Sequence, residues 1–193
     1  PFARHRPLSP LRAPRYPAAP MSASNAPHSR RSDVAFWGMF AALLALALWP
    51  VWTTDILPVV DAGSHLQLIR ILHEHAHNAL LQKHFVRVHA LVPYLTYYKA
   101  VDWVMYLTDL ERANRIVLSL CLAALPLSTL SLLRAAGRSR WLVLGVMPWL
   151  LNPDFFMGFF NFLMSIPLFL WLLSQHLWLL RKPRLWRAVL VAA

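Results

Sequence analysis

The sequence predicts an all-α, polytopic membrane protein, and three observations lead to this fold class. Hydrophobic residues make up 58% of the 193 positions and charged residues only 14%, whereas an average soluble domain has about 45–50% and about 25% respectively. The apolar residues are gathered into long uninterrupted runs, and the mean hydropathy is +0.46. Basic residues flank these runs instead of interrupting them. Together these features are typical of helices that cross a bilayer.

The chain begins with a polar tail and a first apolar run. Residues 1–33 are rich in Pro, Arg, Ser and Ala and show no periodicity, so they are expected to form a disordered basic tail. Val34 to Trp52 contains no charged residue and approaches the roughly 20 residues that a crossing needs. No cleavage site of small residues follows this run. We therefore predict an uncleaved anchor over 34–52.

The next segment is expected to be a helical loop outside the membrane. Residues 53–112 are more polar than the runs on either side. Ser64 and Gln67 have the spacing of a capping box, and the amphipathic pattern that follows predicts a helix over 65–82. Residues 91–107 are apolar but carry two charges. They are compatible with an interfacial helix, a re-entrant helix or a poor span.

Further apolar runs complete the helical membrane domain, which is expected over 34–193. Spans are expected at residues 113–133, 141–151 and 155–180, with a fifth, incomplete one at 185–193. The layout therefore has about four spans and the start of a fifth. Because the sequence starts with Pro1 and stops inside an apolar run, it is expected to be a fragment of a longer protein, with Met21 as an alternative start.

The distribution of charge predicts an orientation. The tail, residues 134–140 and residues 181–187 together carry 13 Lys and Arg and one acid, whereas the remaining segments carry six basic residues and seven acids. The positive-inside rule then places the N-terminus in the cytoplasm. The formal net charge of +11 lies at the ends of apolar runs and not on one face. It predicts a lipid bilayer as partner and excludes nucleic acid.

Asp61 and His65 are the first candidates for chemistry. They place a carboxylate and an imidazole near the membrane surface, directly after the first span. A carboxylate there can act as a general base towards a hydroxyl or bind a divalent metal ion. On spacing alone a structural interpretation is favoured: Asp61 belongs to the turn before a helix, and His65 forms a hydrogen bond in the first turn of that helix.

Four motifs occur in an order that resembles a known family. They are Asp61-x-x-x-His65, Val92-Pro93, Glu111-Arg-Ala-Asn-Arg115 and Asn152-x-x-Phe155-x-x-Gly158-Phe-x-Asn161-Phe162. Over about residues 34–182 the chain resembles bacterial polytopic proteins related to the C-type glycosyltransferases.

That resemblance implies an enzyme of the bacterial inner membrane that takes a sugar from a polyprenyl-phosphate donor at the periplasmic face. It assigns the catalytic carboxylate to Asp61, with His65 supporting it. The chain departs from the commoner family pattern at Gly63-Ser64, where Pro and Asn are usual, and it lacks a second adjacent acid. A non-enzymatic transport or assembly component is therefore the alternative.

A second motif, His73-Glu-His-Ala-His77, matches the H-E-x-x-H pattern of zinc metalloproteases. On a helix this spacing brings two imidazoles one turn apart to one face, with Glu74 beside a metal-bound water. The segment supplies no obvious third ligand, and it lies next to Arg70 on a face that is expected to be solvated. Three interpretations stay open: a protease site, an incidental metal site, and a solvated helix face.

Five other polar residues are candidates for substrate binding. Arg112 and Arg115 open a span at the outer surface, where they can bind a lipid phosphate or extend to lipid headgroups. Asn152, Asp154 and Asn161 lie near the outer ends of two spans. They can line a cavity that faces Asp61, or they can serve as a turn and an interhelical hydrogen bond.

Overall fold

The fold was examined in a computed structural model, which describes residues 30–87 and 93–192. Every regular element in these residues is helical, so the all-α fold class is confirmed there. In chain order the elements are α1 (Arg30–Thr53), α2 (Ala62–Glu74), α3 (Ala79–His84), η1 (Pro93–Leu95), α4 (Thr96–Met105), α5 (Leu110–Ala135), η2 (Arg140–Trp149), α6 (Pro153–Met157), α7 (Phe160–Arg181) and α8 (Leu185–Ala192).

Three helices are long and apolar enough to cross a membrane. They are α1, α5 and α7, with 24, 26 and 22 residues. At 1.5 Å per residue each exceeds the roughly 30 Å of a hydrocarbon core. At most 39% of the apolar window of any of them is buried within the protein, so most of their apolar surface needs a lipid environment. The protein is therefore membrane-embedded and polytopic.

Two of the expected spans have a different structure. Residues 141–151, expected as a span, fold largely as η2, a ten-residue 3₁₀-helix that contains Pro148. At about 2 Å per residue it covers only about 20 Å. The run 155–180 is divided at Gly158 and Phe159 into the short α6 and the long α7. Gly158 ends α6 with a φ of +91°, a left-handed conformation that suits glycine.

The structure at both ends of the described chain refines the boundaries expected for the N-terminal tail and the fifth apolar run. The helix α1 begins at Arg30, so the last residues of the expected tail (30–33) are helical, and residues 1–29 lie outside the described residues. The Asp33 carboxylate lies 2.6 Å from Arg140 at the start of η2, which ties these elements together. The fifth apolar run forms α8 and packs against α7.

The loop between α1 and α5 differs from the helix expected over 65–82. The helix α2 already begins at Ala62, so Ser64 and Gln67 lie inside it and the capping box is wrong. It ends at Glu74, and α3 starts separately at Ala79 because the Asn78 side chain accepts hydrogen bonds from two backbone N–H groups of α3.

The described part of the interrupted segment 91–107 contains no helix long enough to cross a membrane. It contains η1 and the ten-residue α4, which at 1.5 Å per residue is about 15 Å long. This helix packs against α2 and α5. Residues 88–92 are outside the described residues.

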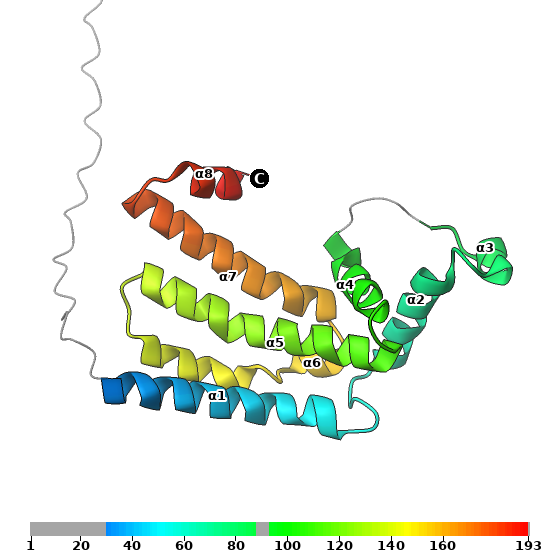
Figure 1. The fold of residues 1–193 in the computed structure, drawn as a ribbon, viewed down its shortest axis with the longest axis horizontal. Helices are drawn as coiled ribbons and strands as arrows, with labels where there is room; N and C mark the ends of the chain where they lie inside the picture. The colour runs from blue at the N-terminus through cyan, green and yellow to red at the C-terminus, as the bar shows by residue number, and fades with distance from the viewer. Residues whose placement is uncertain (1–29, 88–92, 193) are drawn as a thin grey trace, which may run out of the picture.

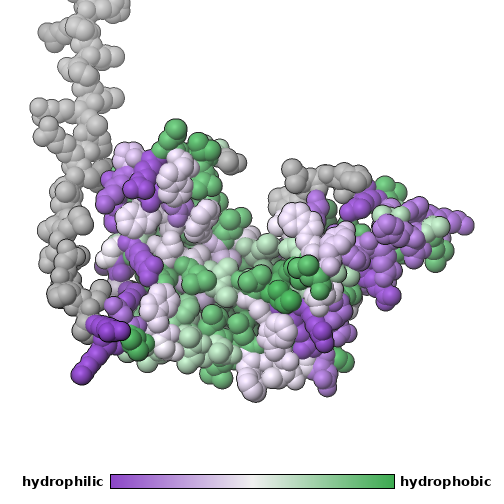
Figure 2. All heavy atoms as spheres, in the orientation of Figure 1, coloured by the Kyte–Doolittle hydropathy of each residue, from purple (hydrophilic) through white to green (hydrophobic). Residues whose placement is uncertain are grey.

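The long helices lie roughly side by side, and their ends define two poles. The start of α1, the α5–η2 turn and the α7–α8 turn lie at one pole, and α2, α3 and α4 gather at the other (Figure 1). The chain returns from the first pole towards the second through η2, which packs beside α1, and then through α6. Figure 2 shows hydrophilic residues concentrated at the two poles and more hydrophobic ones between them. We call the pole with α2 and α4 the loop pole.

Candidate functional site

A cavity at the loop pole brings together segments that are distant in the sequence. Its volume is about 390 Å³. It lies between the start of α2, the start of the η1–α4 segment and the α6–α7 junction. The residues that line it are Asp61, His65, Tyr94, Gly158, Phe159, Phe160, Asn161, Phe162 and Ser165. Three of the residues proposed from the sequence, Asp61, His65 and Asn161, are thus assembled in one place.

Asp61 occupies the N-cap position of α2, but its side chain does not cap the helix. The residue is exposed, and none of the ion pairs among the described residues involves it. The loop that carries it is held by a hydrogen bond from the Val60 N–H to the Phe156 carbonyl oxygen, 2.9 Å long. The backbone at Asp61 is therefore held at a helix N-terminus, while its carboxylate takes part in no helix cap or ion pair among the described residues.

His65 lies one turn further along α2 and is almost fully buried, with 8% of its surface exposed. Its Nδ1 lies 2.7 Å from the hydroxyl oxygen of Tyr98 on α4, and its ring packs 5.0 Å from the ring of Phe160. Its other ring nitrogen, Nε2, is buried and has no hydrogen-bond partner in the described structure. The hydrogen bond expected for His65 is thus made to another helix and not within its own first turn.

Gly158 closes the site from the side of α6. A Cβ atom placed on it would lie 3.1 Å from the Asp61 Cβ, 3.1 Å from the His65 Nε2 and 3.2 Å from Val59 Cγ1. Any side chain at this position would therefore press on both candidate residues, and its φ of +91° is already unfavourable for other residues. The sequence drew attention to Gly158 as part of a motif, but it did not indicate this contact.

Two tyrosines are functional candidates that were missed in the sequence. Tyr94 lines the cavity, and Tyr98 is buried beside His65. Burial raises the pKa of the Tyr98 hydroxyl, and a hydrogen bond with Tyr94 and the negative charge of Asp61 raise it further. The only sequence signal was the spacing of four between two aromatic residues, which places them on one face of a helix.

Asn161 lines the cavity and also has a structural contact. Its side-chain oxygen accepts a hydrogen bond of 3.1 Å from the backbone N–H of Tyr97, which ties α7 to the start of α4. The Tyr97 hydroxyl in turn donates to the side-chain oxygen of Asn114 on α5, 2.8 Å away. Asn161 is therefore both an interhelical contact and a wall of the cavity.

Asn152 and Asp154 do not line the Asp61 cavity. Asn152 caps α6, because its side-chain oxygen accepts a hydrogen bond of 2.9 Å from the Phe155 N–H. Asp154 lies in the first turn of the same helix, where a negative charge is favourable. Of the two interpretations offered for Asn152 and Asp154, a cavity wall or a turn, the structure has the turn, which starts α6.

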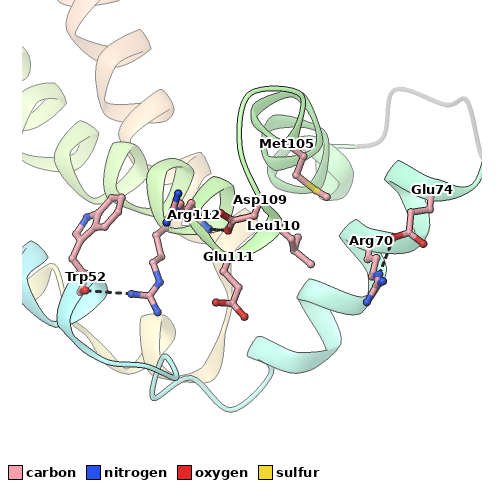
Figure 3. Close-up of a pocket in the computed structure, with 9 residues that line it drawn as sticks. Trp52, Arg70, Glu74, Met105, Asp109, Leu110, Glu111 and Arg112 are labelled. Atoms are coloured by element: carbon pink, nitrogen blue, oxygen red, sulfur yellow. Dashed lines mark hydrogen bonds and ion pairs between the residues drawn. The ribbon is translucent and has the colours of Figure 1, made fainter.

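Arg112 and Arg115 line a second, larger cavity of about 710 Å³ at the loop pole (Figure 3). The Arg115 guanidinium donates to the carbonyl oxygens of Trp52, Thr54 and Asp55, at 3.3, 2.8 and 3.0 Å. It thus satisfies carbonyls at the end of α1, a contact that the sequence did not indicate. Phosphate binding by Arg115 stays a prediction.

The other arginines of this second cavity also have acidic partners. Arg112 Nε lies 3.3 Å from the Asp109 carboxylate, and Arg70 forms a bond of 2.8 Å to Glu74, as Figure 3 shows. The N–H of Arg112 lowers the pKa of Asp109, and the Arg112 charge contributes further. Because Arg70 and Arg112 are paired with acids and Arg115 is bonded to backbone carbonyls, this cavity is less suited than the first to a role in chemistry.

The H-E-x-x-H segment does not form the continuous helix that a zinc protease uses. The helix α2 ends at Glu74, and His77 lies in the turn that follows. His73 Nδ1 is 2.7 Å from the carboxylate of Asp102 on α4, which is buried. Within the described residues no group of three or more His, Cys, Asp or Glu side chains is placed to hold a metal ion. The helix geometry that motivated His73 and His77 as metal ligands is thus wrong.

Comparison with known proteins gives no further assignment. No protein-family model matches the sequence, and neither the curated proteins nor the solved structures include a significant match. The resemblance to C-type glycosyltransferases therefore stays a prediction.

Proposed function

We propose that the cavity around Asp61 is the site of a membrane-embedded transferase of the C-type glycosyltransferase kind, with a polyprenyl-phosphate-linked sugar as donor. The observation that carries the proposal is the assembly of Asp61, His65 and Asn161 around one cavity at the end of the long helices. A donor with a membrane-bound lipid and a polar sugar would present its reacting bond at this level. The cavity combines an exposed carboxylate with aromatic walls, a composition that suits a sugar ring.

The proposed chemistry uses Asp61 as a general base. The carboxylate takes the proton of an acceptor hydroxyl, the hydroxyl oxygen bonds to the anomeric carbon, and the bond from that carbon to the lipid-phosphate oxygen breaks. The leaving group is then the polyprenyl phosphate with its electron pair. Asp61 suits the role because its carboxylate is exposed and is not committed to an ion pair or a helix cap.

The distribution of charge and the arrangement of the poles support a proposed orientation. The three segments that carry 13 of the Lys and Arg residues include the α5–η2 and α7–α8 turns, which lie at the pole opposite to α2 (Figure 1). The positive-inside rule places that pole in the cytoplasm. We therefore propose a bacterial inner-membrane location in which the loop pole, with Asp61, faces the periplasm.

The test substitutes Asp61→Asn in the full-length protein. Membrane vesicles are supplied with the cell's own pool of polyprenyl-linked sugars carrying a radioactive label, and transfer of the label to envelope glycans is measured. Loss of a general base lowers such a rate by about 10²–10⁴-fold. The matched control is Asp55→Asn, because Asp55 is an exposed acid of the same loop that does not line the cavity.

The expected result is loss of transfer for Asp61→Asn and normal transfer for Asp55→Asn, with both variants at the wild-type level in the membrane. Unchanged transfer by Asp61→Asn would contradict the proposal and favour the non-enzymatic alternative.

A further inference from the structure

The unpartnered ring nitrogen of His65 requires an explanation. A buried polar atom without a hydrogen bond costs about 1–3 kcal/mol, and such atoms are rare in folded proteins. His65 is 92% buried, since 8% of its surface is exposed, and it lines the Asp61 cavity. Its Nε2 has no partner within the described residues. A ligand in the cavity would supply the missing partner.

Whether that partner is a donor or an acceptor depends on which ring nitrogen of His65 carries the proton. The second nitrogen, Nδ1, lies 2.7 Å from the Tyr98 hydroxyl. Burial raises the pKa of this hydroxyl above its ordinary value, so the phenol keeps its proton and can donate it. If Tyr98 donates to Nδ1, a neutral imidazole must carry its own proton on Nε2.

Few other titratable groups surround His65. The titratable groups around the cavity are Asp61 at the start of α2, Tyr94 in η1 and Tyr98 on α4. The lining residues from α6 and α7 carry no charge. Tyr94 is exposed and lies within hydrogen-bonding reach of Tyr98.

We propose that Tyr98 is a positioning residue that holds His65 as the tautomer protonated at Nε2, and that His65 Nε2–H is a hydrogen-bond donor for the ligand of this cavity. The cavity then offers a donor at His65 beside an acceptor at Asp61. The complementary ligand has an oxygen that accepts next to a hydroxyl that donates. Neighbouring hydroxyl groups of a sugar have this chemistry. The identification of the ligand as a sugar rests on the proposed function, whereas the proposed tautomer of His65 does not.

The tautomer is measured directly by NMR. The full-length protein is prepared with ¹⁵N-labelled histidine rings in lipid nanodiscs, at a pH where histidine is neutral. A His65→Gln variant identifies the signals of His65 among the nine histidines. The expected result is a proton on Nε2 only, with an Nδ1 shift typical of a nitrogen that accepts a hydrogen bond. A proton on Nδ1 would overturn the proposal, and this measurement needs no substitution at Tyr98.

The role of Tyr98 is tested with Tyr98→Phe, which removes one hydroxyl and keeps the packed ring. The Nδ1 signal of His65 should then move to the position of a nitrogen without a donor. The control is Tyr106→Phe, because the Tyr106 ring lies 5.1 Å from His73 and does not line the cavity. An Nδ1 shift that is the same in Tyr98→Phe and in the wild type would overturn the proposal.

The two proposals can fail separately. In the transfer assay Tyr98→Phe should lower the rate about tenfold, the effect of one hydrogen bond, and should leave Asp61 in place. If Asp61→Asn keeps full transfer while the His65 signals behave as expected, the transferase is wrong and the positioned donor stands. If His65 carries its proton on Nδ1 while Asp61→Asn loses transfer, the reverse holds.

Discussion

The helix α2 carries two histidines that form almost the same contact with α4. His65 Nδ1 lies 2.7 Å from the Tyr98 hydroxyl, and His73 Nδ1 lies 2.7 Å from the Asp102 carboxylate. Both contacts hold α2 against α4 at the loop pole. They differ in the chemistry of the partner and in the surroundings: His65 lines the Asp61 cavity, whereas His73 is partly exposed, with 26% of its side-chain surface accessible.

The partner, and not the distance, decides what each histidine can do. A phenol that keeps its proton can donate, so it leaves the proton of His65 on Nε2, where a ligand can use it. An ionised carboxylate can only accept, so His73 must carry a proton on Nδ1. The second pair therefore compensates the buried Asp102 carboxylate, and its role is to hold the two helices together. The first pair, by contrast, leaves a buried polar atom available at the cavity.

The largest expected effect on stability comes from removing the His73 side chain from its pair with Asp102. His73→Ala leaves the Asp102 carboxylate, of which 8% is accessible, without its partner, and removing one member of a buried pair costs about 3–5 kcal/mol. We expect a loss near the lower limit, about 3 kcal/mol of unfolding free energy, because His73 is partly solvated. His65→Ala should cost less, about 1–3 kcal/mol, because it leaves only a neutral hydroxyl.

The measurement is reversible unfolding in mixed detergent micelles. The control is His77→Ala, because His77 is exposed and such substitutions usually stay within about 0.5 kcal/mol. The double variant His73→Ala/Asp102→Ala should be more stable than His73→Ala alone, since it removes the uncompensated charge. Equal stability of the His73 and His77 variants would show that the contact between His73 and Asp102 does not stabilise the fold.

The next largest effect comes from a substitution at Gly158, which acts on the His65–Tyr98 pair and not on the His73–Asp102 pair. Gly158→Ala places a Cβ within 3.1 Å of the His65 Nε2 and of Asp61, and it also forces alanine into a left-handed conformation, which costs about 1–2 kcal/mol. We expect a loss of about 2 kcal/mol together with a shift of the His65 ring signals, while those of His73 stay unchanged.

A matched glycine substitution is available in α2. Gly63 lies inside the helix with nothing within 4 Å of its added Cβ, so Gly63→Ala should stabilise the protein by up to about 1 kcal/mol. If Gly158→Ala had the same stabilising effect as Gly63→Ala, the close contact of Gly158 with the first pair would be refuted.

The predictable part of the fold consists of features that the local sequence determines. Long uncharged runs have few alternatives to a membrane helix, and α1, α5 and α7 formed where such runs were found. The break between α2 and α3 was missed because the spacing of leucines continues through it, while one side chain, Asn78, caps a new helix. The form of η2 was missed because an apolar run does not reveal which helix type it adopts.

The candidate site, like the fold, has residues that the local sequence predicted and contacts that it did not predict. Asp61 and His65 were found because their spacing on one chain segment is local. Tyr98 lies 33 residues beyond its partner His65, and the contact of Gly158 with Asp61 joins segments that only the packing of α6 brings together. Arg115 shows the same limit: its three acceptors lie in the last turn of α1 and just after it, and no pattern around Arg115 itself indicates them. Residue type predicted the chemistry, but pairings between helices required the structure.

The smallest expected effect concerns the hydroxyl proton of Tyr98, which distinguishes the His65–Tyr98 pair from the His73–Asp102 pair. Burial raises the pKa of Tyr98, and burial likewise raises that of Tyr97, so neither should titrate at the ordinary value near 10. A phenol whose pKa is higher in the folded than in the unfolded state stabilises the fold below about pH 10, and this contribution is lost as the pH rises further.

In an alkaline titration followed by tyrosinate absorbance, wild type and Tyr98→Phe should release the same number of tyrosine protons up to about pH 11. One tyrosinate fewer in Tyr98→Phe would mean that Tyr98 gives up its proton readily. Tyr98 would then not be enclosed beside His65 as the structure has it, and the contrast between the buried phenol pair and the partly exposed carboxylate pair would be weakened.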